Sequence, residues 1–247
     1  MRILLVNPNM TDAMTRSMTQ VARDLAGEDA EIVPLTATRG FPYIASRAEA
    51  QISGANVLEM ISEHHRSVDA VIVAAFGDPG LVAARELFDL PVVGMAEAAV
   101  MTAAMLGERF SVVTFSPHMA RWYTDCVRLT GLEPRFTGVR CPAEAPASVD
   151  NVAETLRDDL VGLVGAATAE DGADVVILGG APLAGLAQQI CDDAPGILID
   201  PVAAATAQAM SLVRLAPNYR RRVGRPAAKS SSGLSRSLST LIAGETP

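Results

Sequence analysis

Residues 69–77, DAVIVAAFG, and residues 174–182, DVVILGGAP, decide the fold of this chain. Each is an apolar run, rich in valine or isoleucine, that begins with aspartate and ends in small residues, which is typical of a strand buried on both faces. Residues 2–9 (RILLVNPN) and residues 109–116 (RFSVVTFS) form a second similar pair. The offsets are 105 residues (69 to 174) and 107 residues (2 to 109). Two nearly equal offsets predict a duplication, with two similar lobes of four strands each.

Strand-like runs alternate with helical patterns along the rest of the chain. We predict strands at residues 2–6, 31–34, 70–74, 92–94, 110–114, 135–139, 175–178 and 197–199. Apolar residues recur at helical spacing in residues 11–25, 47–63, 81–88, 96–106, 118–129, 149–167, 183–191 and 202–215. The alternation predicts an α/β fold whose parallel sheets are flanked by helices. We divide the chain into a first lobe (1–96 and 202–216), a second lobe (97–201) and a basic, partly flexible tail (217–247).

The composition excludes several classes of protein. About half of the 247 residues are hydrophobic (49%) and few are aromatic (4%), which suits helices packed closely on buried sheets. No apolar run reaches the roughly 18 residues that a membrane span needs, and no charged leader precedes the first strand, so we expect a cytoplasmic protein without a membrane partner. Three cysteines without a C-x-x-C pair and three histidines without ligand spacing predict no metal site. Phosphate-binding glycine motifs are absent, so we expect no nucleotide cofactor.

The charge is distributed unevenly. The net charge is −8, but from residue 214 onward there are seven basic residues and one acidic residue, which leaves 13 basic and 27 acidic residues in the remainder. A basic tail on an acidic body suggests nucleic-acid binding as one interpretation. We favour a tail that lies on its own body or on a neighbouring subunit, because an acidic body repels phosphate. We expect residues 229–239, KSSSGLSRSLS, to be flexible.

The ends of four predicted strands indicate a ligand site. Ligands bind beyond the carboxyl ends of strands in open α/β sheets, so two facing lobes predict one cleft between them. Each loop there leads into a helix, whose free N–H groups favour an anion such as a carboxylate or an enolate. The residues that we predict to contact a small-molecule substrate are Asn7, Asn9, Tyr43, Ala75, Phe76, Gly77, Thr114, Phe115, Ser116, Gly180, Ala181 and Pro182.

Six blocks in this order resemble a known family: ILLVNPN, RGFPYIASRAE, AAFGDPGL, PVVGMAEAA, RFSVVTFS and ILGGAPLAGL. They are similar to hydantoin and allantoin racemases of the aspartate/glutamate racemase superfamily, over residues 2–215. The resemblance implies two pseudo-symmetric flavodoxin-like lobes with the active site between them, a homo-oligomer and no cofactor. It also implies two cysteines, one per lobe, that act as opposed acid and base on a carbon next to a carbonyl.

The sequence departs from this pattern at both cysteines. In the family the first cysteine precedes F-G-D-P-G, and Ala75 stands there; the second follows the L-G of the second lobe, and Gly180 stands there. Neither residue can carry a proton. We expect Cys126, Cys141 and Cys191, which lie elsewhere, to be buried core thiols. Racemisation by two cysteines is therefore not available to this sequence.

Three other side chains are candidates for moving a proton. Asp78 follows Phe76–Gly77, although it can equally hold the turn or cap a helix. Glu97 lies at a predicted helix start, where a carboxylate complements the helix dipole. His118 follows a predicted strand end, and histidine is a residue type suited to acid–base work, although an exposed surface position is the simpler interpretation.

Three functions remain open. The first is a cofactor-independent enzyme, of isomerase or lyase type, that stabilises an anion of a small carboxylate, cyclic ureide or related carbonyl compound. The second is a non-catalytic protein that binds such a molecule. The third is a racemase whose cysteines were replaced, but the mixed pair Ala75 and Gly180 favours natural divergence.

Overall fold

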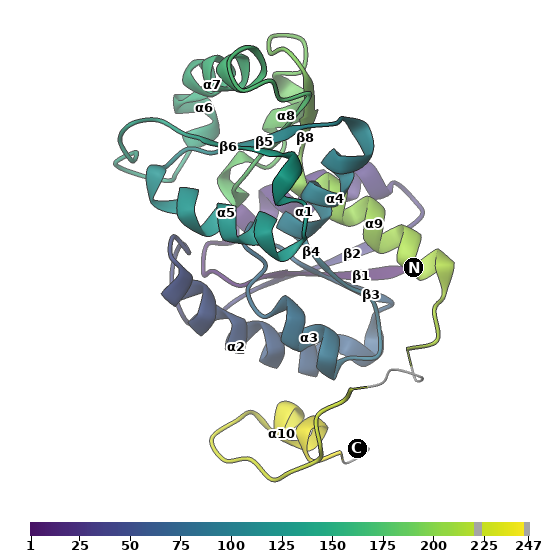
Figure 1. Cartoon of the computed structure of the whole chain (residues 1–247). Helices are drawn as coiled ribbons and strands as arrows, with labels where there is room; N and C mark the ends of the chain where they lie inside the picture. Colours follow the sequence, from purple (N-terminus) through teal and green to yellow (C-terminus); the bar gives the residue numbers. More distant parts are fainter. Residues whose placement is uncertain (220–223, 245–247) are drawn as a thin grey trace.

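The computed structural model describes residues 1–219 and 224–244, in two lobes stacked on one another (Figure 1). The strands are β1 (Arg2–Asn7), β2 (Glu31–Thr36), β3 (Ala70–Val73), β4 (Val92–Gly94), β5 (Phe110–Val113), β6 (Phe136–Arg140), β7 (Val175–Leu178) and β8 (Ile197–Ile199). The α-helices are α1 (Asp12–Ala26), α2 (Arg47–His64), α3 (Leu81–Leu87), α4 (Met95–Leu106), α5 (Ala120–Leu129), α6 (Val152–Thr155), α7 (Arg157–Ala169), α8 (Leu186–Gln189), α9 (Pro201–Leu215) and α10 (Arg236–Ile242). All eight predicted strands are present, and the predicted helix at residues 149–167 is divided into α6 and α7.

Each lobe is built on a sheet of four parallel strands, as predicted. The strand orders are β2-β1-β3-β4 and β6-β5-β7-β8, so the second lobe repeats the first. The central strands are buried on both faces, which explains their unbroken apolar runs. The predicted α/β fold and its internal repeat are therefore confirmed.

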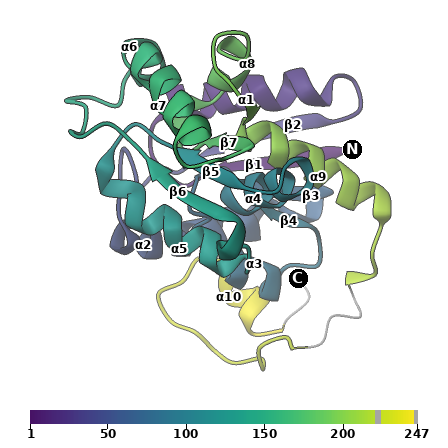
Figure 2. The ribbon, with the colours of Figure 1, turned by 45° about the horizontal axis from the view of Figure 1, so that its top comes forward.

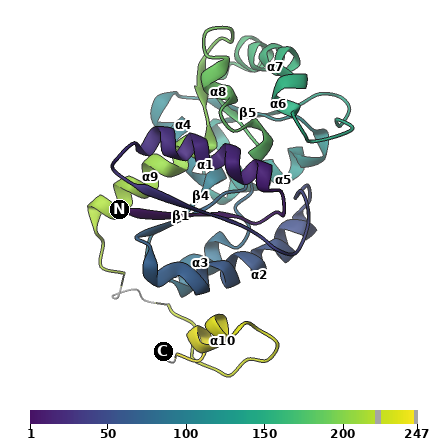
Figure 3. The ribbon, with the colours of Figure 1, turned by 180° about the vertical axis from the view of Figure 1, so that it is seen from behind.

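Helices cover both faces of each sheet. In the first lobe, α2 and α3 pack on the outer face over Leu4 and Val6, while Ile3 and Leu5 face the core that continues into the second lobe. Figure 3 shows α1 and α9 on this inner side. In the second lobe, α7 lies across the strands on one face (Figure 2), and α4 and α5 pack on the other.

Two helices each follow the last strand of one lobe and pack on the sheet of the other. Helix α4 follows β4 of the first lobe but packs on β7 and β8, and α9 follows β8 but packs on β3 and β4. The exchange joins the lobes through a common apolar core. The boundaries that we assigned at residues 96/97 and 201/202 remain predictions.

The tail contains a helix that the sequence patterns do not predict. Ser235 caps α10 by accepting a hydrogen bond from the N–H of Leu238, whose side chain is buried, and α10 packs against α2. The helix is too short for a periodic pattern to stand out among its serines. Arg225 forms an ion pair with Asp89, whereas Arg220–Arg222, the densest part of the basic run, lie outside the described residues. No helix in the described parts of the chain is long and apolar enough to cross a membrane.

Candidate functional site

The strand ends of both lobes meet at a cluster of aromatic side chains. The ring of Phe76, beyond β3, packs edge-on against that of Tyr123 on α5, with 4.6 Å between centroids. A Cβ atom placed on Gly179, beyond β7, lies 3.3 Å from Phe76 and 3.2 Å from Tyr123. The loops after β3 and β7, one from each lobe, are therefore in contact through Phe76.

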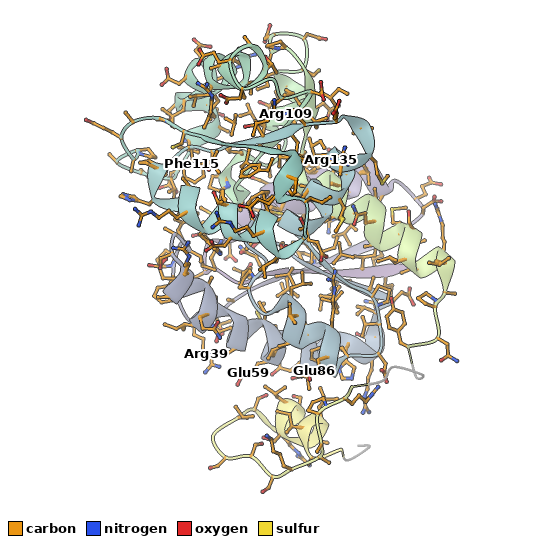
Figure 4. The ribbon with its side chains drawn as sticks, viewed as in Figure 1. Arg39, Glu59, Glu86, Arg109, Phe115 and Arg135 are labelled. Atoms are coloured by element: carbon orange, nitrogen blue, oxygen red, sulfur yellow. The ribbon has the colours of Figure 1, made fainter. Side chains whose placement is uncertain are left out.

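A loop of the first lobe closes over this cluster. Tyr43, between β2 and α2, stacks at a tilt on Phe115 beyond β5, with 5.8 Å between ring centroids; Phe115 is labelled in the upper lobe of Figure 4. A few residues later, Arg47 forms an ion pair with Asp125 of α5. By contrast, Arg39 of the same loop pairs with Glu59 on the outer helix α2 (Figure 4). The aromatic contact and the Arg47 ion pair hold the two lobes together over the strand ends.

Three hydroxyl groups gather under the aromatic rings. Tyr43 and Tyr123 both donate hydrogen bonds to the sulfur of Met119, and burial raises the pKa of both phenols far above its ordinary value. The hydroxyl of Thr114, at the end of β5, is near enough to Tyr123 to oppose part of that rise in pKa. It nevertheless has no partner with hydrogen-bond geometry among the described residues. Both tyrosines thus stay protonated at neutral pH and act as donors.

Ala75 and Gly180 border this group of hydroxyls. Ala75 is buried directly before Phe76. Gly180 has a φ angle of 129°, and a Cβ atom placed on it lies 2.8 Å from the Phe115 ring and 3.6 Å from the Tyr123 hydroxyl oxygen. A side chain at position 180 therefore requires the Phe115 ring to shift, and Phe115 fills the space that a larger residue would need.

The predicted polar contacts Asn7 and Asn9 are buried at the end of β1 and hold their own loop. The Asn7 side chain donates to Asn9 and Thr15 and accepts from the Asn9 backbone N–H. The Asn9 oxygen also accepts from Thr11 N, whereas the only partner of its amide nitrogen among the described residues is the sulfur of Met14, at 3.6 Å. Sulfur is a weak acceptor, so the amide nitrogen of Asn9 has no strong hydrogen-bond acceptor among the described residues.

Ser116 and His118 begin the 3₁₀ turn before α5. The Ser116 hydroxyl accepts from the backbone N–H of His118 at 3.4 Å, so it caps the turn. The His118 side chain is exposed at the surface. The structure thus brings Ser116 to the buried strand ends, as it does Thr114, but leaves the His118 ring outside them.

Asp78 and Glu97 are both engaged in holding α4. The carboxylate of Asp78 accepts hydrogen bonds from the backbone N–H groups of Ala96 (2.9 Å) and Glu97 (2.8 Å). Burial nevertheless raises the pKa of Asp78 to about 7, because desolvation outweighs these two hydrogen bonds. The Glu97 side chain is partly exposed and pairs with Arg85.

The second lobe also uses an aspartate to link the loop after its third strand to the start of a helix, but there the aspartate lies at the helix start. There, Asp200 caps α9 and also accepts from the N–H of Gly185, in the loop after β7. In the first lobe the aspartate, Asp78, lies in the loop, and Gly94 lies at the helix start, where a Cβ atom would be 2.4 Å from that carboxylate. Each lobe thus needs one aspartate and one glycine for this link.

None of the three cysteines occupies position 75 or 180, although Cys126 lies near enough to Tyr123 to contribute to the rise in the pKa of that phenol. Cys126 on α5 is buried, and its burial raises the pKa of its thiol. Cys141 is half-buried. The prediction of a buried core thiol is confirmed for Cys126 but wrong for Cys141 and for Cys191. Cys191 is exposed because α8 ends at Gln189 and residue 191 lies in the turn beyond it.

A cavity of about 250 Å³ lies beside the strand ends, at the predicted contacts Ala181 and Pro182. Thr11 and Met14 of the first lobe line one side, and the loop around Asn151 lines another. Gly77 does not open into a cavity: a Cβ atom there would be 2.0 Å from Trp122. Met119, Trp122 and Tyr123 were not predicted as contacts from the sequence. Helical spacing places all three on α5 or just before it but does not show which loop they face.

Comparisons with known proteins show the family and the fold of this chain. A family model described as Asp/Glu/Hydantoin racemase matches residues 3–209. A hydantoin racemase of Paenarthrobacter aurescens is 33% identical over 217 residues, covering 87% of this chain and 92% of that protein. The structure is similar to allantoin racemase from Klebsiella pneumoniae, with a TM-score of 0.86, 32% identity and coverage of 96% and 98% of the two chains. For allantoin racemase from Pseudomonas fluorescens the TM-score is 0.83, the identity 32%, and the coverage 94% and 100%.

Proposed function

Because the chain belongs to the Asp/Glu/hydantoin racemase family, we propose that it is an enzyme acting on a small carbonyl compound without cysteine chemistry. Its site is the group of strand ends between the lobes. The substrate is a cyclic ureide of the hydantoin or allantoin kind, and the reaction is of isomerase or lyase type. The enzyme acts by stabilising the anion that forms when a bond next to the carbonyl breaks.

The observation that carries this proposal is a buried site furnished only with uncharged hydrogen-bonding groups. Thr114, Tyr43 and Tyr123 supply hydroxyls there, and Asn9 supplies an amide donor. The buried side chains of the described residues that can form hydrogen bonds include asparagine, serine, threonine and Tyr123, but no lysine, arginine or histidine. A neutral ureide can replace such weak contacts with its own carbonyl and N–H groups, whereas a dicarboxylate brings two charges that no buried cation balances.

We propose further that Ala75 and Gly180 stand where the family's two cysteines act. Phe115 then occupies part of the space of the second cysteine. Without two thiols, proton removal from one face of the carbon and delivery to the other must use different groups. Of the three candidates, Asp78 and Glu97 are bound to α4 and Arg85, and the His118 side chain is exposed. We therefore propose that a group of the substrate itself moves the proton. We propose that the reaction needs no cofactor.

One feature favours a second candidate function, a protein that binds the same compounds without turning them over. None of the three candidate proton carriers is hydrogen-bonded to the group of hydroxyls, because Asp78 and Glu97 are bound to α4 and Arg85 and the His118 side chain is exposed. The homo-oligomer and the cytoplasmic location that we expect from the sequence stay predictions under either function.

The test is incubation in D2O with a panel of hydantoins, allantoin, amino acids and malonates, followed by NMR. Deuterium uptake next to the carbonyl supports an isomerase, and loss of substrate supports a lyase or ring-opening enzyme. Binding by thermal shift without either change favours the binding protein. Turnover of amino acids or malonates alone contradicts the ureide assignment, and no reaction and no binding across the panel contradicts both functions.

A further inference from the structure

The phenol of Tyr123 lies beside the empty side-chain position of Gly180. Its oxygen is 3.6 Å from the Cβ atom that a residue at 180 would have, and its ring touches Phe76 of the opposite lobe. Tyr123 is almost completely buried, and it comes from α5, a helix fixed to the first lobe by the Arg47–Asp125 ion pair. The position of its hydroxyl is therefore set by both lobes.

The hydrogen bonds that the hydroxyls make in this structure are weak. Tyr123 and Tyr43 share one thioether sulfur, Sδ of Met119, with 3.1 Å for Tyr123. A thioether is a poor acceptor compared with a carbonyl oxygen. The nearby Thr114 hydroxyl is completely buried and has no partner among the described residues. A buried donor without a good acceptor is unfavourable in the empty protein, so this arrangement suits a ligand that brings an oxygen.

We propose that the Tyr123 and Thr114 hydroxyls together bind the carbonyl oxygen of the substrate, which makes Tyr123 a catalytic residue; this rests on the proposed function. When the C–H bond at the adjacent carbon breaks heterolytically, the proton passes to another group of the substrate, as proposed above, and the electron pair of that bond spreads onto the carbonyl oxygen. The two hydroxyls keep their protons and strengthen their hydrogen bonds as the charge grows. Tyr43 is a positioning residue that shares the Met119 sulfur with Tyr123 as hydrogen-bond acceptor.

The test follows the tyrosine hydroxyls directly. The chain has three tyrosines, so labelling with ¹³C at the ring carbon that bears the hydroxyl gives three signals, which single Tyr→Phe variants assign. Hydantoin is the probe, titrated into the full-length protein. We expect the Tyr123 signal to shift with saturation while the Tyr219 signal stays constant.

Affinity and turnover provide the second readout. Tyr123→Phe keeps the packed ring, and we expect it to bind hydantoin about fivefold to tenfold more weakly, the effect of one hydrogen bond. With a substrate that the enzyme converts, Tyr123→Phe should lower kcat by a larger factor than it raises KM, because the hydrogen bond from the Tyr123 hydroxyl strengthens in the transition state. Tyr219→Phe is the matched control and should change neither.

Two results separate this assignment from the proposed function. If hydantoin binds but the Tyr123 signal is constant and Tyr123→Phe binds equally well, the assignment is wrong and the proposed function stands. If Tyr123→Phe loses its native circular dichroism, Thr114→Val replaces it, and unchanged affinity in that variant overturns the assignment. If no member of the panel binds to the wild type, both the function and the assignment are wrong.

Discussion

Replacing Thr114 by valine should stabilise the empty protein and weaken ligand binding. Thr114 is completely buried at the end of β5, and its hydroxyl has no hydrogen-bond partner among the described residues. Valine has nearly the same shape and favours extended backbone, so the substitution removes an unsatisfied polar atom without leaving a cavity. The same atom is the one that we assign to the substrate carbonyl.

The expected size follows from the cost of a buried donor without a partner, about 1–3 kcal/mol. We take the lower end, about 1 kcal/mol, because the Tyr123 hydroxyl lies near Thr114. For a chain of this length that is a rise in Tm of about 2–4 °C. Loss of one hydrogen bond to the ligand should weaken binding about fivefold. A residue selected only for folding would not show these opposite effects.

The assay is chemical denaturation with and without hydantoin, together with two matched variants. Ser53 on α2 carries the other buried hydroxyl without a partner, so Ser53→Ala should raise stability and leave binding unchanged. The buried hydroxyl of Thr206 donates to Val202 O at 2.8 Å, so Thr206→Val should not raise stability. A Thr114→Val protein that is less stable than the wild type, or that binds hydantoin equally well, refutes the reasoning.

Three further predictions concern the loops after the central strands. Burial raises the pKa of Asp78 to about 7, compared with about 3.9 in the unfolded chain. The stability that protonated Asp78 contributes is therefore complete below about pH 4 and is lost by about pH 7. Denaturation across this range should show a fall in the free energy of unfolding on the order of 4 kcal/mol, and Asp78→Asn should remove this pH dependence. Gly94→Asp alone should destabilise the protein, because the new side chain clashes with Asp78. Combined with Asp78→Gly, it should restore the α4 cap and recover most of the stability. A double-mutant cycle measures this, and additive losses of stability contradict it. Ala75→Cys with Gly180→Cys should raise the rate of deuterium exchange into hydantoins above that of the wild type, more so with Phe115→Ala; no rise in either variant contradicts the assigned positions.

Much of the fold could be predicted because it depends on local patterns. The segments 69–77 and 174–182 revealed the repeat, since a parallel strand buried on both faces must be an unbroken apolar run. Strand boundaries differ from the prediction by two residues at most. Helix α10 escaped prediction because its seven residues are stabilised by packing on α2 rather than by their own periodicity.

The strand ends that we propose as the site could also be named from the sequence, but the packing of side chains around them could not. Parallel topology places Thr114 and Gly180 at strand ends, whatever their side chains do. Whether Tyr43 and Tyr123 point into the same space depends on how a loop and a helix that are 80 residues apart pack together. The periodicity of the sequence does not show this packing. The cap formed by Asp78 illustrates the same limit, because its partners at Ala96 and Glu97 become neighbours only in the folded chain.

The most direct test of a site that works without thiols is turnover by a protein that has none. Cys126→Ala, Cys141→Ala and Cys191→Ala combined remove every cysteine of the chain. The measurement is the NMR rate in D2O with the hydantoin that the wild type converts fastest, in wild type and triple variant at equal concentration of folded protein. We predict equal rates. A rate that falls to the background of the uncatalysed reaction in the triple variant would show that a cysteine carries the chemistry and would contradict the account.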